Sequence, residues 1–452
     1  MKIRVTEHNW NIVTKILNPS FNHSKGQGNE LGVIGTIKKV SDQVFIVAEI
    51  FEPSAGDVDC KRRCLRFSPN YIRRVQLQGK KNNANGLIFF HTHPFSDEHV
   101  SFSPYDDAEE PKLMANLKDV WPSSEHIGIV AGKKAIMARV YANDGNVYPI
   151  TNLFVIGRTL KVISGDGCAE VTSKPEHIFD RSMAITGGGA LAILGKLQIA
   201  IVGVGGTGSL MAELLKRAGC RNLILIDDDC VEETNLNRLL HASVQDVKEK
   251  RKKVHVSAYE NYITGMGCEV EAIDGNIVND SHLQEYLKNA DILIGCIDKD
   301  TPRCILNKIA VETCIPYIDL GTEIGIENDK VQSLDARVTY VYPGGPCLEC
   351  RGLISYDNIR LEGLQPEERA RHIGLGYCRN IDIRQPAVME LNMRAASLAS
   401  LYIRHLVQPF LDVCLDTDMR EALVMLKHKQ PSLKKENNGP CAICGYSKNN
   451  ER

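Results

Sequence analysis

The fold of most of this chain is decided by the stretch Leu197-Gln-Ile-Ala-Ile-Val202-Gly203-Val-Gly205-Gly206-Thr-Gly208. Its apolar first half predicts a buried strand, and the glycines lead into a helix that we expect to run through Leu214. Glycines let the backbone approach a phosphate at the N-terminus of a helix. The next predicted strand, residues 222–226, ends at Asp227, where an acid at this spacing can hold a ribose. The pattern therefore predicts a nucleotide site whose phosphate loop contains Gly203, Gly205, Gly206 and Gly208.

The surrounding sequence divides into two parts. From about residue 177, apolar strands alternate with amphipathic helical stretches, which indicates a doubly wound parallel sheet. Residues 1–162 have the pattern of a mixed α/β domain, and the polar, turn-rich residues 163–176 separate the two parts. We therefore expect an α/β protein with domains at 1–162 and 177–452.

The composition excludes several classes of protein. The hydrophobic fraction of 43%, the charged fraction of 24% and the net charge of −2 are ordinary for a globular protein. That charge argues against partners bound through bulk charge, such as nucleic acid or a membrane surface. The most apolar stretch, residues 190–206, contains Lys196 and Gln198, so it is not expected to span a membrane. The N-terminus lacks a signal-peptide core, and we expect a cytoplasmic protein.

The segment after Asp227 separates two kinds of nucleotide-binding protein. A G-x-G-G-x-G loop also fits a nicotinamide dehydrogenase. However, Asp227-Asp-Asp229-Cys-Val231-Glu-Glu-Thr-Asn235-Leu-Asn237-Arg238 resembles the D-x-D-x-V-x-x-S-N-L-N-R stretch of the ThiF/MoeB and ubiquitin-activating family. The resemblance implies an ATP site in which Asp227 and Asp229 bind the nucleotide, with Asp227 on the ribose. Asn235 and Arg238 would contact the phosphates, for which the planar arginine fork is suited.

The same resemblance implies a phosphate-binding lysine. The family pattern D-V-G-x-x-K-V corresponds here to residues 246–254, which are two residues longer. We choose Lys253, because Val254 follows it and the predicted helix continues. Lys250 and Lys252 remain alternatives, and most of this basic run is expected to be a solvated helix face.

Two further residues are assigned by the resemblance. Asp298 ends the predicted strand that begins at Asp291, and at this strand end the family has an aspartate that binds magnesium on the triphosphate. Asp300 is the alternative, with a surface charge as its simplest role. Arg181 resembles the family's arginine before the glycine strand, which reaches ATP across a dimer, so a homodimer through this domain is expected.

A second site is predicted in the first domain. The segment Gly86-Leu-Ile-Phe-Phe-His-Thr-His-Pro94 is an apolar strand that ends in two histidines. Residues i and i+2 share one face of a strand, so His91 and His93 can reach one metal ion. Catalytic zinc takes three protein ligands and leaves one position for water. Asp106, in Ser103-Pro104-Tyr105-Asp106, offers the third ligand from a helical first turn, although Ser103 is also explained as a helix cap.

This constellation resembles the JAMM/MPN (JAB) metalloproteases, which have H-x-H-P, a spacer and S-x-x-D. The resemblance covers about residues 1–150 and implies zinc on His91, His93 and Asp106, with Ser103 bonded to the oxyanion. The family has seven residues between the second histidine and the serine, whereas this chain has nine. A count of seven would put Pro104 in the ligand position, where its side chain cannot bind metal, so we infer a two-residue insertion.

The family also needs an upstream glutamate as general base. Glu30 lies just before an early predicted strand, as the family pattern expects. Glu49 is the alternative, although an alternating strand explains it equally well. We choose Glu30.

Four of the fifteen cysteines form two C-x-x-C pairs. This spacing predicts a closed, structural zinc site with four thiolate ligands, formed by Cys347, Cys350, Cys441 and Cys444. The ThiF/MoeB family has the same arrangement, so that resemblance spans about residues 175–450. Cys378 is a candidate for a thioester-forming cysteine, with Arg379 able to lower its pKa.

These patterns together predict an enzyme that uses ATP, magnesium, one catalytic zinc and one structural zinc. It would adenylate the C-terminal glycine of a ubiquitin-like protein and cleave a peptide or isopeptide bond after the same glycine. Such fusions resemble bacterial ubiquitin-like conjugation or antiviral systems, where a conjugating enzyme is a further expected partner. One alternative is activation of a sulfur-carrier protein for thiamine, molybdopterin or cysteine synthesis. Another is an adenylation enzyme regulated by a non-catalytic JAB domain.

Overall fold

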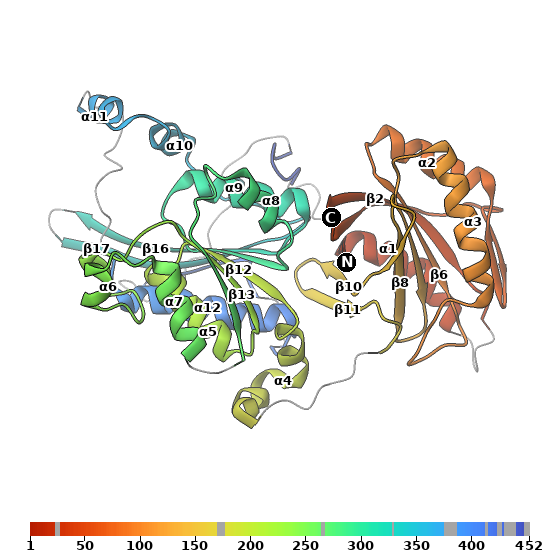
Figure 1. Ribbon diagram of the computed structural model, residues 1–452, viewed down its shortest axis with the longest axis horizontal. Helices are drawn as coiled ribbons and strands as arrows, with labels where there is room; N and C mark the ends of the chain where they lie inside the picture. The colour runs from red at the N-terminus through yellow and green to blue at the C-terminus, as the bar shows by residue number, and fades with distance from the viewer. Residues whose placement is uncertain are drawn as a thin grey trace. The chain divides into compact units, whose positions relative to one another are not determined.

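The chain divides into two compact units, Met1–Thr172 and Ser173–Arg452, and each has its own sheet and core (Figure 1). The computed structural model describes residues 1–22, 28–169, 177–263, 267–327, 330–374, 387–411, 415–422, 427–428 and 440–446. None of the helices in these ranges combines the length and the apolar character needed to cross a bilayer.

The first unit is built on a nine-stranded sheet with the order β11-β10-β1-β3-β2-β6-β7-β8-β9. Its strands are β1 Lys2–Thr6, β2 Gly32–Ser41, β3 Val44–Phe51, β6 Gly86–Thr92, β7 His126–Ala131, β8 Ile136–Tyr141, β9 Val147–Pro149, β10 Asn152–Ile156 and β11 Leu160–Ser164. A separate hairpin is formed by β4 Val58–Lys61 and β5 Cys64–Phe67. The helices are α1 Glu7–Leu17, η1 Asn18–Phe21, α2 Pro69–Lys81 and α3 Pro104–Val120.

Helices cover both faces of this sheet because its central strands are apolar on both sides. On β6, Ile88 and Phe90 pack into the core cluster that includes Val13 and Leu17 of α1. The alternate residues Leu87 and Phe89 pack with α2 and α3 on the other face. Strand alternation therefore directs the following odd-numbered residue, His91, toward the face that α3 covers.

The first unit extends past residue 162, the boundary that the sequence predicts. Strand β11 continues to Ser164, and isolated bridges pair Asp166 with Met137 and Cys168 with His99. These backbone pairings attach the first part of the predicted linker to the first unit.

The second unit is built on an eight-stranded sheet with the order β14-β13-β12-β15-β16-β17-β18-β19. Its strands are β12 Gln198–Val202, β13 Asn222–Ile226, β14 Glu269–Ile273, β15 Ile292–Gly295, β16 Tyr317–Glu327, β17 Lys330–Val341, β18 Asp418–Ala422 and β19 Lys427–His428. The helices are η3 His177–Phe179, α4 Asp180–Leu194, α5 Gly206–Arg217, η4 Glu233–Asn235, α6 Val244–Lys248, α7 Lys253–Ile263, α8 Ser281–Leu287, α9 Asp300–Thr313, α10 Tyr356–Glu362, α11 Pro366–Gly374 and α12 Met389–Val407.

The first five strands of this sheet are parallel, with the chain-order pattern 3-2-1-4-5. This is the Rossmann-like arrangement, in which ligands bind beyond the carboxyl ends of the strands where the order reverses. Strands β12 and β15 flank that reversal. The chain then turns antiparallel from β16 to β19.

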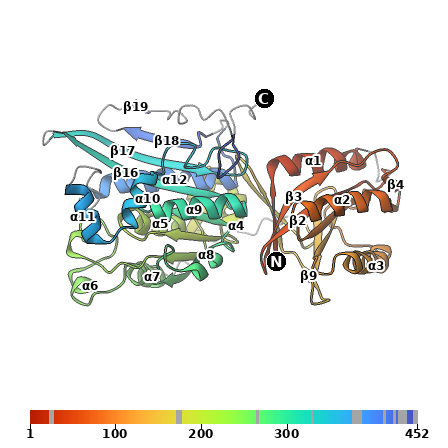
Figure 2. The ribbon, with the colours of Figure 1, turned by 90° about the horizontal axis from the view of Figure 1, so that it is seen from above.

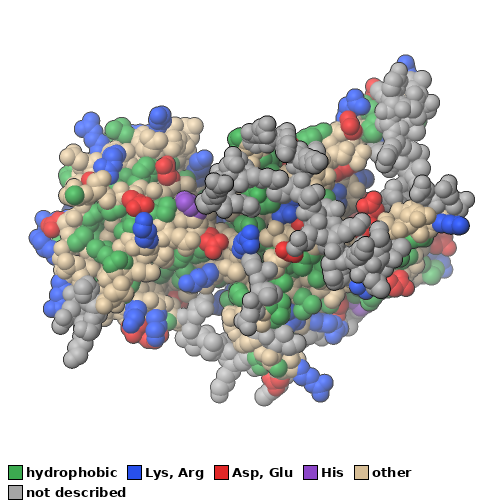
Figure 3. Space-filling view, turned by 180° about the vertical axis from the view of Figure 1, so that it is seen from behind, with side chains coloured by type: hydrophobic (Ala, Val, Ile, Leu, Met, Phe, Trp, Pro, Cys, Tyr) green, Lys and Arg blue, Asp and Glu red, His purple; other side chains and the backbone are tan. Residues whose placement is uncertain are grey.

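Helices also cover both faces of the second sheet, with α8 and α9 on one side and α5, α7 and α12 on the other (Figures 1 and 2). The central strands between them have buried apolar residues, such as Ile199, Leu225 and Leu293. Charged side chains of both signs are interspersed over the face of the molecule in Figure 3. This mixture agrees with the small net charge of −2.

Candidate functional sites

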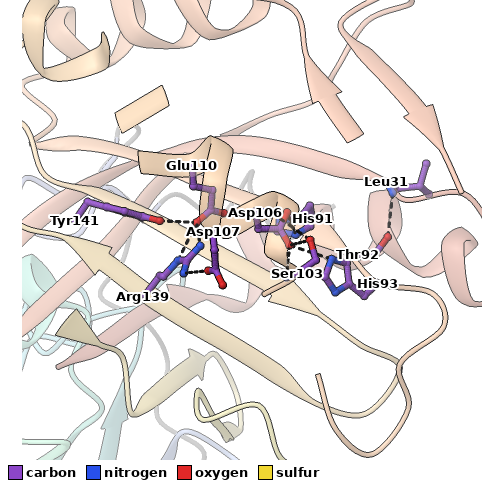
Figure 4. Close-up of polar contacts among 10 residues, drawn as sticks. All are labelled: Leu31, His91, Thr92, His93, Ser103, Asp106, Asp107, Glu110, Arg139 and Tyr141. Carbon is purple, nitrogen blue, oxygen red and sulfur yellow. Dashed lines mark hydrogen bonds and ion pairs between the residues drawn. The ribbon is translucent and has the colours of Figure 1, made fainter. Parts of the chain in front are cut away.

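The structure brings His91, His93 and Asp106 together at the end of β6. Their possible ligand atoms all lie within 4.8 Å of one another (Figure 4). His91 Nε2 is 3.5 Å from Asp106 Oδ1, and His93 Nε2 is 3.3 Å from Asp106 Oδ2. Ligand atoms held about 2.0–2.2 Å from a tetrahedral zinc stand about 3.3–3.5 Å apart, so the spacing fits that metal.

The burial of the two histidines favours a metal site over a simple ion pair with Asp106. His91 and His93 are buried, and the whole-residue exposure of each is 6% or less. Within the described part of the chain, His91 Nε2 has no hydrogen-bond partner. Because buried polar atoms are normally satisfied, this nitrogen is well suited to a metal ion. The donor set of two imidazoles and one carboxylate is also one that catalytic zinc uses.

Asp106 is oriented by the start of α3. Ser103 is the N-cap, and its backbone N–H and hydroxyl each donate to Asp106 Oδ2 over 2.7 Å. Pro104 occupies the first turn, where its missing N–H is not needed. Ser103 therefore caps the helix in this structure and also lies beside the carboxylate. Burial opposes ionisation of Asp106, but the neighbouring His91 and His93 outweigh it and hold its pKa well below the usual range.

Glu30 is the upstream glutamate that faces this group. It is 5% exposed, and burial raises the pKa of its carboxyl against the charges of His93 and His91. The segment is fixed at the strand end because the Leu31 N–H donates to Thr92 Oγ1 over 2.9 Å. The Thr92 N–H in turn donates to the Leu31 carbonyl over 3.0 Å.

Glu49 lies elsewhere in the unit. It pairs with Thr36 between β3 and β2, and it accepts a hydrogen bond from Asn82 Nδ2 over 3.2 Å at the end of α2. Of the two sequence candidates, the structure therefore brings only Glu30 to the histidines.

In the second unit, the glycine loop joins β12 to α5 through a tight turn. Gly203 has φ 88°, a value that side chains disfavour. A Cβ on Gly208 would lie 1.9 Å from the Gly203 carbonyl oxygen, so only glycine permits this close packing. Gly205 is the N-cap of α5, and a Cβ there would meet nothing within 4 Å. The loop therefore leaves open space at the N-terminus of a twelve-residue helix, where anions bind.

Asp227 and Lys253 lie next to this loop. Asp227 accepts the Val204 N–H over 2.7 Å and the Asp229 N–H over 2.9 Å. Burial raises the pKa of the Asp227 carboxyl, against the charge of Lys253 and these backbone bonds. Lys253 begins α7, and its Nζ is 2.6 Å from Asp229 Oδ2. The alternative Lys252 instead bonds the Asp228 carbonyl over 2.7 Å.

Arg238 also lies against the glycine loop, since a Cβ on Gly206 would be 3.0 Å from Arg238 Cγ. Its guanidinium contacts the Thr234 carbonyl and Asn237 Oδ1. Asn235 accepts the Glu232 N–H over 3.0 Å through its side-chain oxygen, which closes the turn that carries Arg238.

Asn392, on α12, touches the same loop and was not identified from the sequence. Its Nδ2 would be 2.4 Å from a Cβ on Gly206, and Thr207 Oγ1 bonds its Oδ1 over 3.2 Å. Asn392 is 3% exposed. The sequence signal that could have identified Asn392 is a polar residue on the apolar face of a predicted helix.

Asp298 is exposed beyond β15, three residues after the strand ends at Gly295. Between the strand end and Asp298, the Ile297 carbonyl accepts a bond from Arg303 Nη2 over 2.5 Å. Asp298 keeps accessible carboxylate oxygens, the donors that magnesium prefers. The alternative Asp300 is buried and accepts bonds from the Ser355 N–H and Asn358 Nδ2, which gives it a structural role.

Two other predicted residues are not brought to this site by any described contact. Arg181 is exposed in the first turn of α4. Cys378 lies outside the described residues.

The four cysteines of the two C-x-x-C pairs come together in the second unit. The Sγ–Sγ distances are 3.9 Å for Cys347–Cys350, 3.8 Å for Cys347–Cys441 and 3.6 Å for Cys350–Cys444. These exceed the length of a disulfide, about 2.05 Å. They match the edge of a tetrahedron of thiolates around zinc, about 3.8 Å for a Zn–S bond of about 2.3 Å. The cluster can therefore hold a zinc ion with no position left for substrate.

Comparison with known proteins adds the family. The ThiF family matches residues 179–435. Ubiquitin-like modifier-activating enzyme 5 of Drosophila persimilis is 27% identical over 177 residues, which are 37% of this chain and 45% of that protein. tRNA threonylcarbamoyladenosine dehydratase of Bacillus subtilis (strain 168) is 30% identical over 168 residues, which are 37% of this chain and 65% of that protein.

The match covers less than two thirds of the length of each of these curated relatives. Among solved structures, that of E. coli MccB with MccA-N7isoASN has a TM-score of 0.47 and 23% identity, over 60% of this chain and 75% of that one. Because the family match covers more than half of its 452 residues, the chain belongs to the ThiF family.

Proposed function

We propose that the second unit adenylates the C-terminal glycine of a ubiquitin-like protein with ATP. The observation that carries this proposal is the set of Asp227, Arg238 and Lys253 around an open glycine loop at the N-terminus of α5. Membership of the ThiF family supports it, as does the similarity to a ubiquitin-like modifier-activating enzyme.

In the proposed reaction, a glycine carboxylate oxygen attacks the α-phosphorus of ATP. The new acyl–phosphate bond forms as the bond from the α-phosphorus to the bridging oxygen breaks, and pyrophosphate leaves. Arg238, Lys253 and the loop N–H groups stabilise the negative charge that develops on the phosphates. Asp227 holds the ribose, and Asp298 would hold magnesium, which neutralises phosphate charge when bound.

The test is ATP–pyrophosphate exchange with each small ubiquitin-fold protein that ends in glycine from the same genome. Exchange that depends on one such protein and disappears when its last glycine is removed supports the proposal. Failure with every candidate would exclude it. Accumulation of a thiocarboxylated partner instead of conjugates would favour the sulfur-carrier alternative.

We further propose that the first unit is a JAMM-type metallopeptidase. His91, His93 and Asp106 would hold zinc, which supplies a Lewis acid and an acidified water when bound. Glu30 would accept a proton from the water that attacks the carbonyl carbon and would return it to the leaving amine. Ser103 would donate a hydrogen bond to the oxyanion. The buried, grouped ligands and the nearby Glu30 support this assignment.

The two halves share a substrate in this proposal, because both reactions act at a terminal glycine. A homodimer through the second unit, with Arg181 reaching the partner's nucleotide, and a thioester on Cys378 remain predictions. A conjugation pathway with its own conjugating enzyme, of the bacterial antiviral kind, is the corresponding biological setting.

Zinc content tests both metal assignments at once. The full chain should bind two zinc ions, and C441S and H93A should each bind one. A wild-type content of one, unchanged in H93A, would support a regulatory, non-catalytic first unit instead.

A further inference from the structure

Arg139, on β8, binds two carboxylates of α3 at once (Figure 4). Its Nε and Nη2 donate to Glu110 Oε2 over 2.9 and 2.7 Å, and its Nη1 donates to Asp107 Oδ1 over 2.6 Å. Tyr141 Oη donates to the same oxygen of Glu110 over 2.8 Å. These carboxylates lie one and four residues after Asp106, so the contacts fix the helical turn that begins at the metal ligand.

The sheet leaves space for the Glu110 carboxylate at a glycine. Gly128 of β7 lies directly opposite Arg139 of β8. A Cβ on Gly128 would be 2.8 and 2.9 Å from the carboxylate oxygens of Glu110, so the glycine leaves room for that group. The side chains of Arg139 and Glu110 are only 18% and 12% exposed, which makes their ion pair stronger than a surface pair.

Arg139 also reaches the histidine side of the group. Its guanidinium carbon is 3.7 Å from the centre of the Phe102 ring, and that ring is 6.2 Å from the ring of His91. Phe102 is 8% exposed. One guanidinium therefore supports Asp106 through α3 and His91 through an aromatic ring.

We infer that Arg139 is a positioning residue for the metal group, holding Asp106 and His91 in the geometry that binds zinc. This inference rests on the proposed metallopeptidase function. Residues behind metal ligands orient them, and their loss typically weakens metal binding by about 10- to 100-fold. Arg139 acts through α3 and Phe102 and takes no part in the reaction itself.

The alternative is that Arg139 stabilises the fold and nothing more. Arg74 provides a matched control, because its Nη2 is 2.7 Å from Asp57 Oδ2 and its guanidinium carbon is 5.0 Å from the centre of the Tyr71 ring. It has the same kinds of contact in the same unit, but it lies outside the metal group.

The test measures zinc affinity of the full chain by competition with a chelator, with the H91A/H93A variant defining the contribution of the other zinc ligands. We expect R139Q to weaken zinc binding at the His–Asp group by about 10- to 100-fold. R139K should show an intermediate loss, since an ammonium cannot make the forked contact. R74Q should leave the affinity within about twofold, and unfolding of the metal-free protein measures the loss of stability of each variant separately.

An R139Q protein that binds zinc as tightly as the wild type would overturn the inference while leaving the metallopeptidase proposal intact. No zinc affinity difference between the wild type and H91A/H93A would instead overturn both. If R139Q does not fold, E110Q removes the charge of the main acceptor with no change of shape. E110Q should then weaken zinc binding by at least about fivefold, and unchanged binding would again overturn the inference.

Discussion

Lys253 and Asp229 form an ion pair beside the glycine loop, with Nζ 2.6 Å from Oδ2. The Lys253 N–H also donates to the Asp229 carbonyl over 3.1 Å, so the start of α7 is attached to the segment after β13. The Lys253 side chain is 11% exposed, whereas that of Asp229 is 67% exposed. The structure thus holds the ammonium group in place, and an incoming phosphate would compete with Asp229 for it.

Replacing Lys253 should therefore weaken nucleotide binding. A hydrogen bond to a charged group contributes about 1.5–3 kcal/mol, so K253M should raise the Kd for ATP by about 10- to 100-fold. K250M is the matched control, because Lys250 lies in the same basic run, and it should bind ATP like the wild type. Isothermal titration with a non-hydrolysable ATP analogue measures both. Equal affinities of K253M and K250M would exclude Lys253 as a phosphate ligand.

Two glycines of the loop should respond differently to alanine. Gly205 faces open space, so G205A should keep the wild-type Tm but lose ATP affinity by at least about tenfold if phosphate fills that space. G208A should lower both the Tm and the affinity, since its Cβ meets a backbone oxygen at 1.9 Å. Thermal unfolding with and without ATP separates the two effects. Wild-type ATP binding by G205A would show that the phosphates lie elsewhere.

The choice of general base can be tested with substitutions that keep the shape of the side chain. E30Q should retain zinc and lose cleavage of a glycine-containing isopeptide substrate by at least about 100-fold, because the amide cannot accept the proton. E49Q should keep wild-type cleavage, since Glu49 bonds Asn82 away from the histidines. The reverse pattern would make Glu49 the base.

A buried charge cluster lies next to the segment between β15 and Asp298, because Arg303 also bonds the Ile297 carbonyl. Asp319 is fully buried, with Arg303 Nε 3.2 Å from Oδ1 and Arg337 Nη2 2.5 Å from Oδ2. R303M should cost about 3–5 kcal/mol of unfolding free energy near pH 7, as for other broken buried pairs. R66M, which changes an exposed arginine, should cost less than about 0.5 kcal/mol. Urea unfolding checks both values, and an R303M loss as small as that of R66M would contradict this account.

The same cluster predicts a pH dependence. Burial alone would raise the pKa of Asp319, but Arg303 and Arg337 reverse this and hold it below its usual value. A lowered folded pKa means that the stabilisation is present above the unfolded pKa, about 3.9, and is lost as the pH falls below it. The difference between R303M and the wild type should therefore narrow below about pH 4. A difference that stays constant to pH 3 would contradict this reading.

Local sequence patterns predicted the parts of each site that lie close together in the chain. The glycine loop, the helix start at Ser103 and the histidine pair at the end of β6 each depend on neighbouring residues, whose periodicity fixes the face they occupy. The insertion before Ser103 did not disturb this, because the helix cap and Pro104 mark the register independently.

Contacts between distant residues could not be predicted in the same way. Glu30 lies near the histidines because β2, which follows it, pairs with β6, which leads to them. This pairing joins segments that are distant in the sequence. The ion pair of Arg139 with Glu110 and the hydrogen bond of Asn392 to the glycine loop join segments that are far apart in the chain. In the sequence, each of these side chains is equally well explained as a solvated charge or an isolated polar residue.

We propose that both units act on one tail, and the most direct test measures the two reactions together. A candidate ubiquitin-like protein with extra residues after its glycine is incubated with the zinc-loaded chain, and ATP–pyrophosphate exchange is then recorded. We predict exchange with the wild-type chain and none with E30Q, whose exchange returns when the trimmed protein is supplied. Equal exchange by both chains with the extended protein, or none by either chain with the trimmed one, would contradict the account.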